Sequence, residues 1–399
     1  MQILELHRSQ DLRKLMQEIK VDDCGINIML PKAITHLVRV NSISNIAANI
    51  LKQELLSLGA DAAIARDSLT GKTKKTDCLL MGNLSQFNRL SEKLKIQPFG
   101  LNRLSKELSE ALSNYQKERF CLKLGKYKID INRRTRIMGI VNLTPDSFSG
   151  DGLYRFQKTT PEWILNYAKQ LIVDGADIID IGGQSSRPES RPVPLKEELS
   201  RVIPVIKLLA KKVRAPVSID TSKPEVAKQA LDNGASLVND ITGLDNPKMR
   251  QIVSRYKSGV VIMHMKGSPR TMQKNPSYNS LIEDIINYLS RSLDLAVNDG
   301  IDINKIIIDP GIGFGKTTDH NLEILRRLSE FKILGRPILV GTSRKSFIGK
   351  ILDKKPHERL SGTLSSCVLA AKNGANIVRV HDVKQAAEAL KITDAILYS

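Results

Sequence analysis

Residues 136–142 read RIMGIVN, residues 177–183 read DIIDIGG and residues 216–220 read PVSID. Each is a short apolar run that ends at a polar residue or a glycine. Such runs recur to the end of the chain and predict eight strands. The strands are Ile137–Val141, Ile178–Ile181, Val217–Asp220, Leu237–Asn239, Val260–Met263, Ile306–Asp309, Ile338–Val340 and Ile377–Val380. Nearly continuous apolar runs of this length are typical of parallel strands that are buried on both faces.

Helical patterns alternate with these runs. They include Glu162–Asp174, Glu197–Val213, Glu225–Asn233, Leu281–Asp299, Leu360–Asn373 and Val383–Leu397. Eight strands, each with a following helix, over 264 residues match a (βα)8 TIM barrel, whose usual length is about 250 residues. A doubly wound open sheet is the alternative, but eight regular units favour a closed barrel.

The chain before the barrel has a different pattern and predicts a small α+β domain, which divides the protein into domains 1–130 and 131–399. The expected strands are Thr35–Val40, Ala60–Ala65 and Cys78–Gly82, and the expected helices are Ile43–Leu58, Leu84–Leu94 and Leu101–Asn114. A polar loop is expected at Asp67–Lys75 and a hairpin at Cys121–Ile131. No residues here have catalytic spacing, so the sequence does not indicate a role for this domain.

The chain carries a formal charge of +19, which is shared between its two parts: +9 in residues 1–135 and +10 in residues 136–399. No run of five or six basic residues occurs, so the excess is most simply a solvated basic surface. An anionic substrate or a weak nucleic-acid contact is the alternative. Only 4% of the residues are aromatic, which argues against a surface that stacks on bases, and we expect no nucleic-acid partner.

The four cysteines lie far apart and show no CxxC spacing, which favours reduced thiols over a disulfide framework or a zinc site. The N-terminal residues lack the apolar centre of a signal peptide, and no stretch of 18 apolar residues occurs. We therefore expect a cytoplasmic protein without a membrane partner.

Polar side chains lie at or just past the ends of seven of the eight predicted strands, and Arg187 follows the other strand at a greater distance. TIM barrels carry their active sites at these strand ends. The polar residues are Asn142, Arg187 beyond Gly182-Gly183, Asp220, Asn239-Asp240, His264, Asp309, Ser343-Arg344-Lys345, Arg379 and His381. Any one of these residues is weak evidence, because surface loops are polar too. Together they predict one cavity.

Three of these residues fit a planar, nitrogen-rich heterocycle. Asp220, Asn239 and Asp309 end apolar strands, where an unpaired carboxylate is costly, and they can pair with ring N–H and amino groups. Alternatively, Asp220 and Asp309 cap the turns that follow them.

A second set fits anionic oxygens. Arg187, Arg379 and His381, with Lys345 nearby, can surround a pyrophosphate, and the amide oxygen of Asn142 can bind Mg²⁺. Each arginine alone is more often a surface ion-pair partner. The loops Thr144–Tyr154 and Gly182–Pro194 are long enough to close over such a site, although their serines are equally ordinary turn residues.

The stretches that hold these residues resemble, in order, the signatures of the dihydropteroate synthase family. They are IMGIVNLTPDSFSGDG, DIIDIGGQSSRP, SIDTSKPEVA, LVNDITG, VIMHMKGSPRTMQ, DPGIGFGK, GTSRKSFIG and RVHDV, and they span essentially all of residues 136–399. The resemblance implies a transferase of folate biosynthesis, the target of sulfonamides. It implies condensation of 6-hydroxymethyl-7,8-dihydropterin diphosphate with 4-aminobenzoate to give dihydropteroate and pyrophosphate, with Mg²⁺ and as a homodimer.

Carried over residue by residue, the resemblance assigns a set of roles to this chain. It implies pterin binding by Asp220, Asn239, Asp309 and Lys345, diphosphate and Mg²⁺ binding by Asn142, Arg379 and His381, and an aminobenzoate pocket of Ser186, Arg187, Pro188, Phe314 and Ser346. Asp220, Lys345 and Asn142 would be catalytic. The second loop departs from the family pattern, because Gln184 and Ser186 stand where Glu and Thr are usual.

Two other functions are considered. A pterin-dependent methyltransferase resembles this barrel but needs no diphosphate site, so Ser343-Arg344-Lys345 and Arg379-Val380-His381 favour the synthase. A barrel that has lost its activity and serves as a binding scaffold is the other. The polar residues that remain at the strand ends argue against that scaffold.

Overall fold

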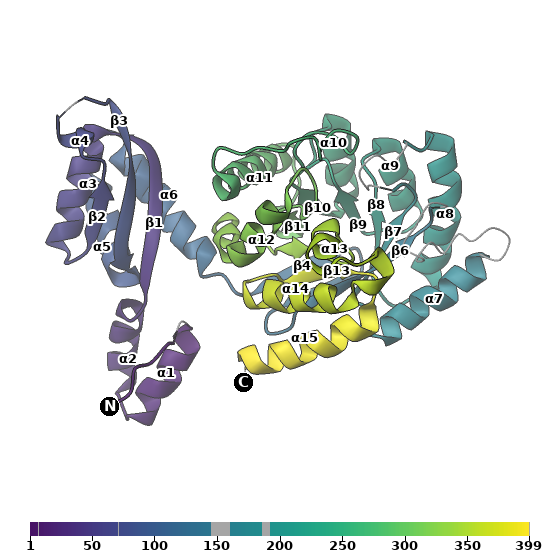
Figure 1. The fold of residues 1–399 in the computed structure, drawn as a ribbon, viewed down its shortest axis with the longest axis horizontal. Helices are drawn as coiled ribbons and strands as arrows, with labels where there is room; N and C mark the ends of the chain where they lie inside the picture. Colours follow the sequence, from purple (N-terminus) through teal and green to yellow (C-terminus); the bar gives the residue numbers. More distant parts are fainter. Residues whose placement is uncertain (7, 71, 145–159, 186–191, 399) are drawn as a thin grey trace. The chain divides into compact units, whose positions relative to one another are not determined.

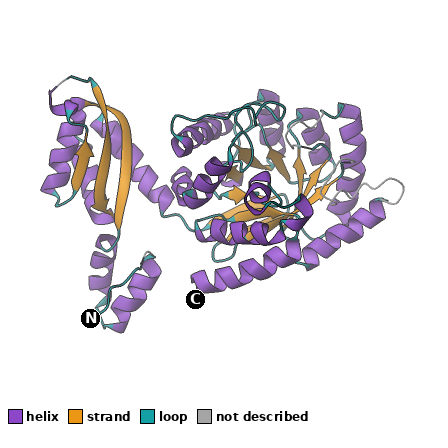
Figure 2. Cartoon of the chain, in the orientation of Figure 1, coloured by secondary structure: helices purple, strands orange, loops and turns teal. Residues whose placement is uncertain are grey.

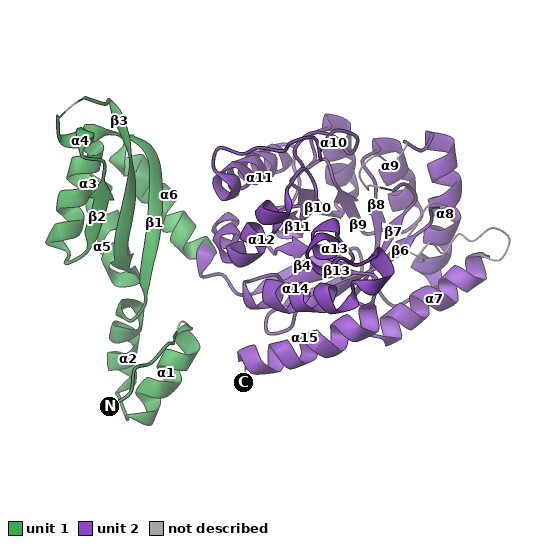
Figure 3. Ribbon diagram, viewed as in Figure 1, with its two compact units in different colours: residues 1–114 green, residues 115–399 purple. Residues whose placement is uncertain are grey.

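The fold is seen in a computed structural model of the chain, which describes residues 1–399 except 7, 71, 145–159, 186–191 and 399. The chain forms two compact units, Met1–Asn114 and Tyr115–Ser399 (Figure 3). Each unit has its own apolar core, as the change of pattern along the sequence predicts.

The first unit is a three-stranded antiparallel sheet with helices packed on one face (Figure 2). Its elements are α1 (Ser9–Glu18), α2 (Asp23–Met29), η1 (Leu30–Lys32), β1 (Thr35–Ser44), α3 (Asn45–Ser57), β2 (Asp61–Ile64), α4 (Asp67–Thr70), β3 (Lys75–Asn83), α5 (Leu84–Leu94) and α6 (Leu101–Tyr115). The strand order is β1-β3-β2. Leu51, Leu80 and Phe87 are fully buried between the sheet and the helices.

Local capping explains several of these boundaries, and one of them corrects the sequence prediction. Asn83 and Gln86 form a reciprocal capping box at the start of α5. The stretch that the sequence predicts as a polar loop contains the short helix α4, where Ser68 is buried and its Oγ donates to the Ala65 carbonyl. A single helical turn is too short to show the periodicity by which helices are predicted.

The second unit contains eight parallel strands, and helices follow the strands (Figure 1). Its elements are β4 (Phe120–Leu124), β5 (Tyr127–Ile131), β6 (Arg136–Asn142), α7 (Pro161–Val173), β7 (Ile178–Gly182), α8 (Leu195–Lys212), β8 (Val217–Asp220), α9 (Pro224–Asp232), β9 (Leu237–Asp240), α10 (Pro247–Tyr256), β10 (Gly259–Met263), α11 (Leu281–Asn298), η2 (Ile303–Lys305), β11 (Ile306–Asp309), α12 (Thr318–Arg326), η3 (Leu328–Leu334), β12 (Leu339–Val340), α13 (Ser346–Leu352), η4 (Pro356–Glu358), α14 (Leu360–Lys372), β13 (Ile377–Val380) and α15 (Val383–Tyr398).

The eight strands close into a barrel. Their order is β11-β10-β9-β8-β7-β6-β13-β12, and a parallel bridge between Ile308 and Ile338 joins the two end strands. This closure confirms the predicted TIM barrel over an open sheet. All eight carboxyl ends therefore meet at one rim.

The hairpin β4–β5 closes the opposite, amino-terminal end of the barrel. Leu122, Leu124, Ile129 and Ile131 pack against the strand residues Met138, Ile178, Leu237, Val261, Ile307, Leu339 and Ile377. The compact units divide after Asn114, so this hairpin, which the sequence places at the end of the first domain, packs with the barrel. Its apolar side has a partner only once the barrel has formed.

Within the described parts of the chain, no helix combines the length and the apolar composition that crossing a membrane requires.

We predict that Leu124→Ala destabilises the barrel unit by about 2–5 kcal/mol, because Leu124 is fully buried and its side chain leaves no space beside Gly259. Chemical denaturation measures this change, and the fluorescence of Trp163, the single tryptophan, reports on the barrel unit alone. The control is Ile392→Ala on α15, an exposed site where the change should stay within about 0.5 kcal/mol. Equal effects of the two substitutions would show that the hairpin does not support the barrel.

Candidate functional site

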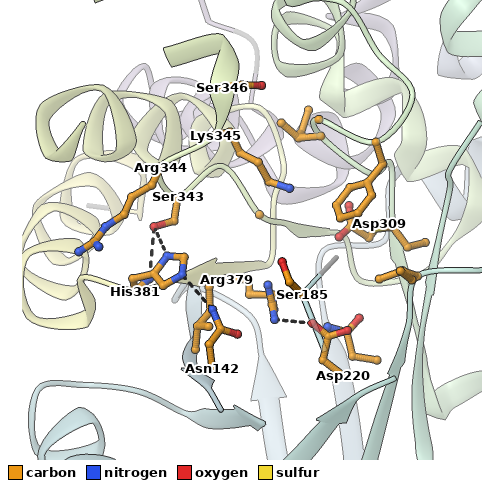
Figure 4. A pocket seen from close by; sticks show the side chains of 18 of the residues that line it. Asn142, Ser185, Asp220, Asp309, Ser343, Arg344, Lys345, Ser346, Arg379 and His381 are labelled. Atoms are coloured by element: carbon orange, nitrogen blue, oxygen red, sulfur yellow. Dashed lines mark hydrogen bonds and ion pairs between the residues drawn. The ribbon is translucent and has the colours of Figure 1, made fainter. Parts of the chain in front are cut away.

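A cavity of about 370 Å³ lies at the carboxyl ends of the barrel strands (Figure 4). All the described residues to which the resemblance assigns a role line it: Asn142, Asp220, Asn239, Asp309, Phe314, Lys345, Ser346, Arg379 and His381. Ser186, Arg187 and Pro188 lie outside the described residues. The closure of the barrel brings together side chains that are up to 239 positions apart in sequence.

The alternation of side chains along each strand decides which polar residues face the cavity. In β9, Asn239 lines the cavity, whereas the next residue, Asp240, does not. Asp240 accepts hydrogen bonds from the backbone N–H groups of Thr242 and Leu244 and so orders the loop that follows. The sequence placed this pair together at the strand end, and the structure separates their roles.

An ion cluster occupies the floor of the cavity. The Nε of Arg379 donates to Oδ2 of Asp180 at 2.7 Å, and one terminal nitrogen of the same guanidinium donates to Oδ2 of Asp220 at 2.7 Å. The amide of Asn239 also donates to Asp180, at 3.1 Å. The strands β7, β8, β9 and β13 are thereby linked across the barrel.

Asp180 is the functional neighbour that the sequence analysis missed. It is fully buried in β7 and holds both Arg379 and Asn239. The available signal was an acidic residue inside an otherwise apolar strand, DIIDIG, because a carboxylate in that position requires a partner.

Burial raises the pKa values of the two carboxyl groups of the cavity. The pKa of Asp220 rises to about 7 because the group is desolvated, while Arg379 opposes the rise and Asp180 adds to it. Desolvation likewise raises the pKa of Asp309 to about 6, against a hydrogen bond from the Gly311 N–H. Both groups can therefore change their charge near neutral pH.

His381 connects two strand ends at the rim. Its Nδ1 lies 2.9 Å from Oγ of Ser343, and its Nε2 lies 3.5 Å from Nδ2 of Asn142. The backbone N–H of His381 also donates to Oγ of Ser343, which fixes the position of the ring. Figure 4 shows His381 and Asn142 on one side of the cavity and Asp220 across from them.

Lys345 enters the cavity from the loop after β12. Arg344 has a positive φ of 58°, and its guanidinium pairs with both carboxylate oxygens of Asp382. Arg359 donates to the backbone carbonyls of Arg344 and Lys345. These contacts hold the loop so that the Lys345 ammonium points into the cavity, 4.1 Å from the centroid of the Phe314 ring (Figure 4).

One part of the cavity wall is apolar. Ile241, Met263, Met272 and Phe314 form a small cluster that lines it. A flat apolar wall beside carboxylates and an amide suits a planar ring that carries hydrogen-bond donors at its edge.

The start of the second loop is also fixed. The side-chain oxygen of Gln184 accepts hydrogen bonds from Lys223 Nζ at 2.8 Å and from the Val193 N–H at 3.2 Å. The same ammonium contacts Glu198 at 2.5 Å. Gln184 therefore holds the described ends of this loop together.

His264 does not join the cavity, contrary to the expectation that all the polar strand ends would form one site. Its Nδ1 lies 2.9 Å from the ammonium of Lys316, and its ring packs edge-on against Tyr288. Burial lowers the pKa of Lys316 to about 7, so the contact does not force two charges together. A residue just after a strand can turn to either side, and the sequence does not decide which.

Comparisons with known proteins give a consistent result. The family model described as "Pterin binding enzyme" matches residues 138–381. The dihydropteroate synthase of Synechocystis sp. is 47% identical over 277 residues, which cover 69% of this chain and 94% of that protein. The Escherichia coli dihydropteroate synthase is 42% identical over 65% of this chain and 91% of its own length.

A longer relative also covers the first unit. A probable bifunctional folylpolyglutamate synthase/dihydropteroate synthase of Halobacterium salinarum is 37% identical over 394 residues, which are 96% of this chain and 46% of that protein. The first unit is therefore shared with a larger protein and is not peculiar to this chain.

Solved structures agree with the fold. A Yersinia pestis dihydropteroate synthase in a sulfonamide complex has a TM-score of 0.67 and 39% identity, covering 70% of this chain and all of that one. The Xanthomonas albilineans dihydropteroate synthase with 4-aminobenzoic acid has a TM-score of 0.65 and 38% identity, covering 70% of this chain and 99% of that one.

We predict that Asp180→Ala costs about 2–5 kcal/mol of unfolding free energy, because Nε of Arg379 and the Asn239 amide lose the buried acceptor that they share, at about 1–3 kcal/mol for each unpaired donor. Denaturation followed by Trp163 fluorescence measures the loss. Asp232→Ala, which removes an exposed partner of Lys228 on α9, is the control and should change little. An unchanged stability of Asp180→Ala would mean that the ion cluster does not hold the strands together.

Proposed function

We propose that the cavity at the carboxyl ends of the barrel strands is the active site of a dihydropteroate synthase, because the chain belongs to the pterin-binding enzyme family. The chain is a transferase of folate biosynthesis that condenses 6-hydroxymethyl-7,8-dihydropterin diphosphate with 4-aminobenzoate and releases pyrophosphate. The observation that carries the assignment of the site is the convergence of carboxylates, cations and an apolar wall on one cavity.

The pterin ring binds at the floor of this cavity in our proposal. Asp220 and Asp309 accept hydrogen bonds from ring N–H and amino groups, and the Asn239 amide is positioned beside them by Asp180. Lys345 contributes a donor from the opposite side, above Phe314. In the complex these hydrogen bonds would add to those that Asp220 accepts from Arg379 and Asp309 accepts from the Gly311 N–H.

The diphosphate binds at the rim, near Asn142, His381 and Arg379. Arg379 already gives two donors to Asp180 and Asp220, so it supplies positive charge behind the pterin as much as a direct contact. No group of three acidic, histidine or cysteine side chains that could hold a metal occurs among the described residues. The arrangement therefore fits Mg²⁺ that takes one ligand from the Asn142 amide oxygen and the others from diphosphate and water.

When bound, Mg²⁺ would neutralise charge on the departing diphosphate. His381 and Asn142 orient that group at the rim. The C–O bond breaks first, and the pterin methylene carries positive charge that the Asp220 carboxylate stabilises across the ring. The amine of 4-aminobenzoate then forms the C–N bond and loses a proton.

The second substrate binds between Phe314, Ser346 and the segment that holds Ser186, Arg187 and Pro188. Phe314 offers an apolar face to the aminobenzoate ring, and Ser346 lies at the start of α13, where backbone N–H groups favour a carboxylate. The solved Xanthomonas albilineans relative is a complex with 4-aminobenzoic acid.

We also propose different roles for the two parts of the chain. The described residues that line the cavity run from Ile140 to His381, so residues 131–399 carry the synthase site. The hairpin β4–β5 supports this barrel, and the residues of the first compact unit serve another role. A homodimer and a cytoplasmic location complete the proposal, both from the likeness to the family.

The first test is a steady-state assay of pyrophosphate release with Mg²⁺, the pterin diphosphate and 4-aminobenzoate. Lys345→Ala should lower kcat/KM for the pterin substrate about tenfold to a hundredfold, because a charge-assisted hydrogen bond is lost. Lys350→Ala, at an exposed lysine on helix α13, which directly follows Lys345, is the matched control and should behave as wild type. Absence of pyrophosphate release by the wild-type protein would refute the function, and normal kinetics of Lys345→Ala would remove Lys345 from the site.

The second test is the pH dependence of pterin binding. Because burial raises the pKa of Asp220 to about 7 and only the carboxylate form accepts hydrogen bonds at both oxygens, affinity should fall as pH drops from 8 to 6. Calorimetry with 6-hydroxymethyl-7,8-dihydropterin, which lacks the titrating diphosphate, measures this directly. Asp220→Asn should bind more weakly and show a flatter profile above pH 7. A wild-type affinity that is constant over this range would contradict the role of Asp220.

A further inference from the structure

A second cavity, of about 320 Å³, lies at the amino-terminal end of the barrel, the end opposite to the proposed active site. Its walls come from β4 of the hairpin, from η2 before β11, and from the segment before β12. The lining includes Lys117, Arg119, Phe120, Lys123, Lys305 and Arg336. All these residues belong to the second compact unit.

The lining of this cavity is strongly basic. Five of the described lining residues are lysine or arginine, and Asp302 is the only carboxylate among them. The Asp302 side chain already accepts hydrogen bonds from the backbone N–H and the amide of Asn304, where it caps η2. Most of the positive charge is therefore not balanced within the cavity.

Arg336 is the strongest indication that this charge is built to receive a ligand. Its side chain is buried, with an exposed fraction of 7% for the residue. One terminal nitrogen donates to the Ile303 carbonyl at 2.6 Å, but Nε has no hydrogen-bond partner among the described residues. A buried guanidinium whose donors are not all paired is costly, and an anion in the cavity that Arg336 lines would offset part of this cost through its charge.

Lys117 adds to the unbalanced positive charge of this cavity. Burial, and next the nearby Arg336, lower the pKa of its ammonium. Its Nζ lies 5.1 Å from the centroid of the Phe120 ring, which forms part of the same wall. Two cations held beside one another repel, and an anion between them would convert the repulsion into two attractions.

We propose that this cavity binds a small, multiply charged anion of the phosphate class, such as pyrophosphate or a phosphate monoester. Its cations come from separate segments and surround a recess, which suits the several oxygens of a tetrahedral group. The volume exceeds that of a single water or chloride and lies at the lower limit of small-molecule sites. The site is independent of the function proposed for the other end of the barrel.

Cys121 makes the proposal testable at the cavity itself, because it lines this recess and is partly exposed. Cys78 and Cys367 are buried, so Cys24→Ser leaves Cys121 as the reactive thiol for iodoacetamide. We expect millimolar pyrophosphate to slow alkylation of Cys121 several-fold, with inorganic phosphate and a nucleoside monophosphate as further arms. Sodium chloride at matched ionic strength should not protect.

Two charge-neutralising double variants, both made in the Cys24→Ser protein, test whether the protection depends on the cavity. Lys117→Gln/Arg119→Gln should lose the protection, whereas Lys211→Gln/Lys212→Gln, an equal change of charge at the exposed end of α8, should keep it. Each rate is compared with that of the same variant without the anion, and thermal denaturation checks that both fold. Equal protection in the two variants, protection by chloride, or no protection of the wild-type cavity would each overturn the proposal.

Discussion

The pairing of Arg379 with Asp180 and Asp220 is the constraint on which the rest of the site depends. It places one guanidinium between two buried carboxylates at the floor of the cavity, where loss of a partner is costly. Because the three residues come from three strands, their contact fixes how those strands meet at the rim. The position of Asn239 follows, since its amide is held by Asp180.

This pairing also shows why the sequence predicts the residues at the rim of the cavity better than those at its floor. Asp220 and Asp309 end apolar runs, so their location follows from the barrel and from the alternation of side chains. The partner of each residue depends on which strands face one another after closure, and no local pattern contains that information. The acid inside the apolar strand at Asp180 indicates that a partner is needed but not which one, and His264 turns away from the cavity to Lys316.

The hairpin β4–β5 shows that packing partners, too, are harder to predict from the sequence than the element itself. Its alternating apolar residues were visible in the sequence, and its strands were predicted at Cys121–Ile131. The sequence did not show that the hairpin closes the amino-terminal end of the barrel, because its packing partners are the inward residues of seven different strands. Covering that end also creates the basic recess beside η2, since the hairpin brings Lys117 and Lys123 next to Arg336. One packing event thus supports the barrel and forms a second cavity.

The ion pairs of Arg379 in the first cavity change the role that the sequence suggests for this residue, which was diphosphate binding. An arginine committed to two carboxylates cannot be a simple diphosphate clamp, since moving it would leave Asp180 and Asp220 buried without their cation. Its charge instead opposes the effect of burial on the pKa of Asp220, which rises only to about 7, so that the carboxylate form is accessible near neutral pH. Direct recognition of the diphosphate then rests mainly on Asn142 and His381 at the rim. The site separates a fixed cation, which tunes the pterin acceptors, from the rim residues that meet the leaving group.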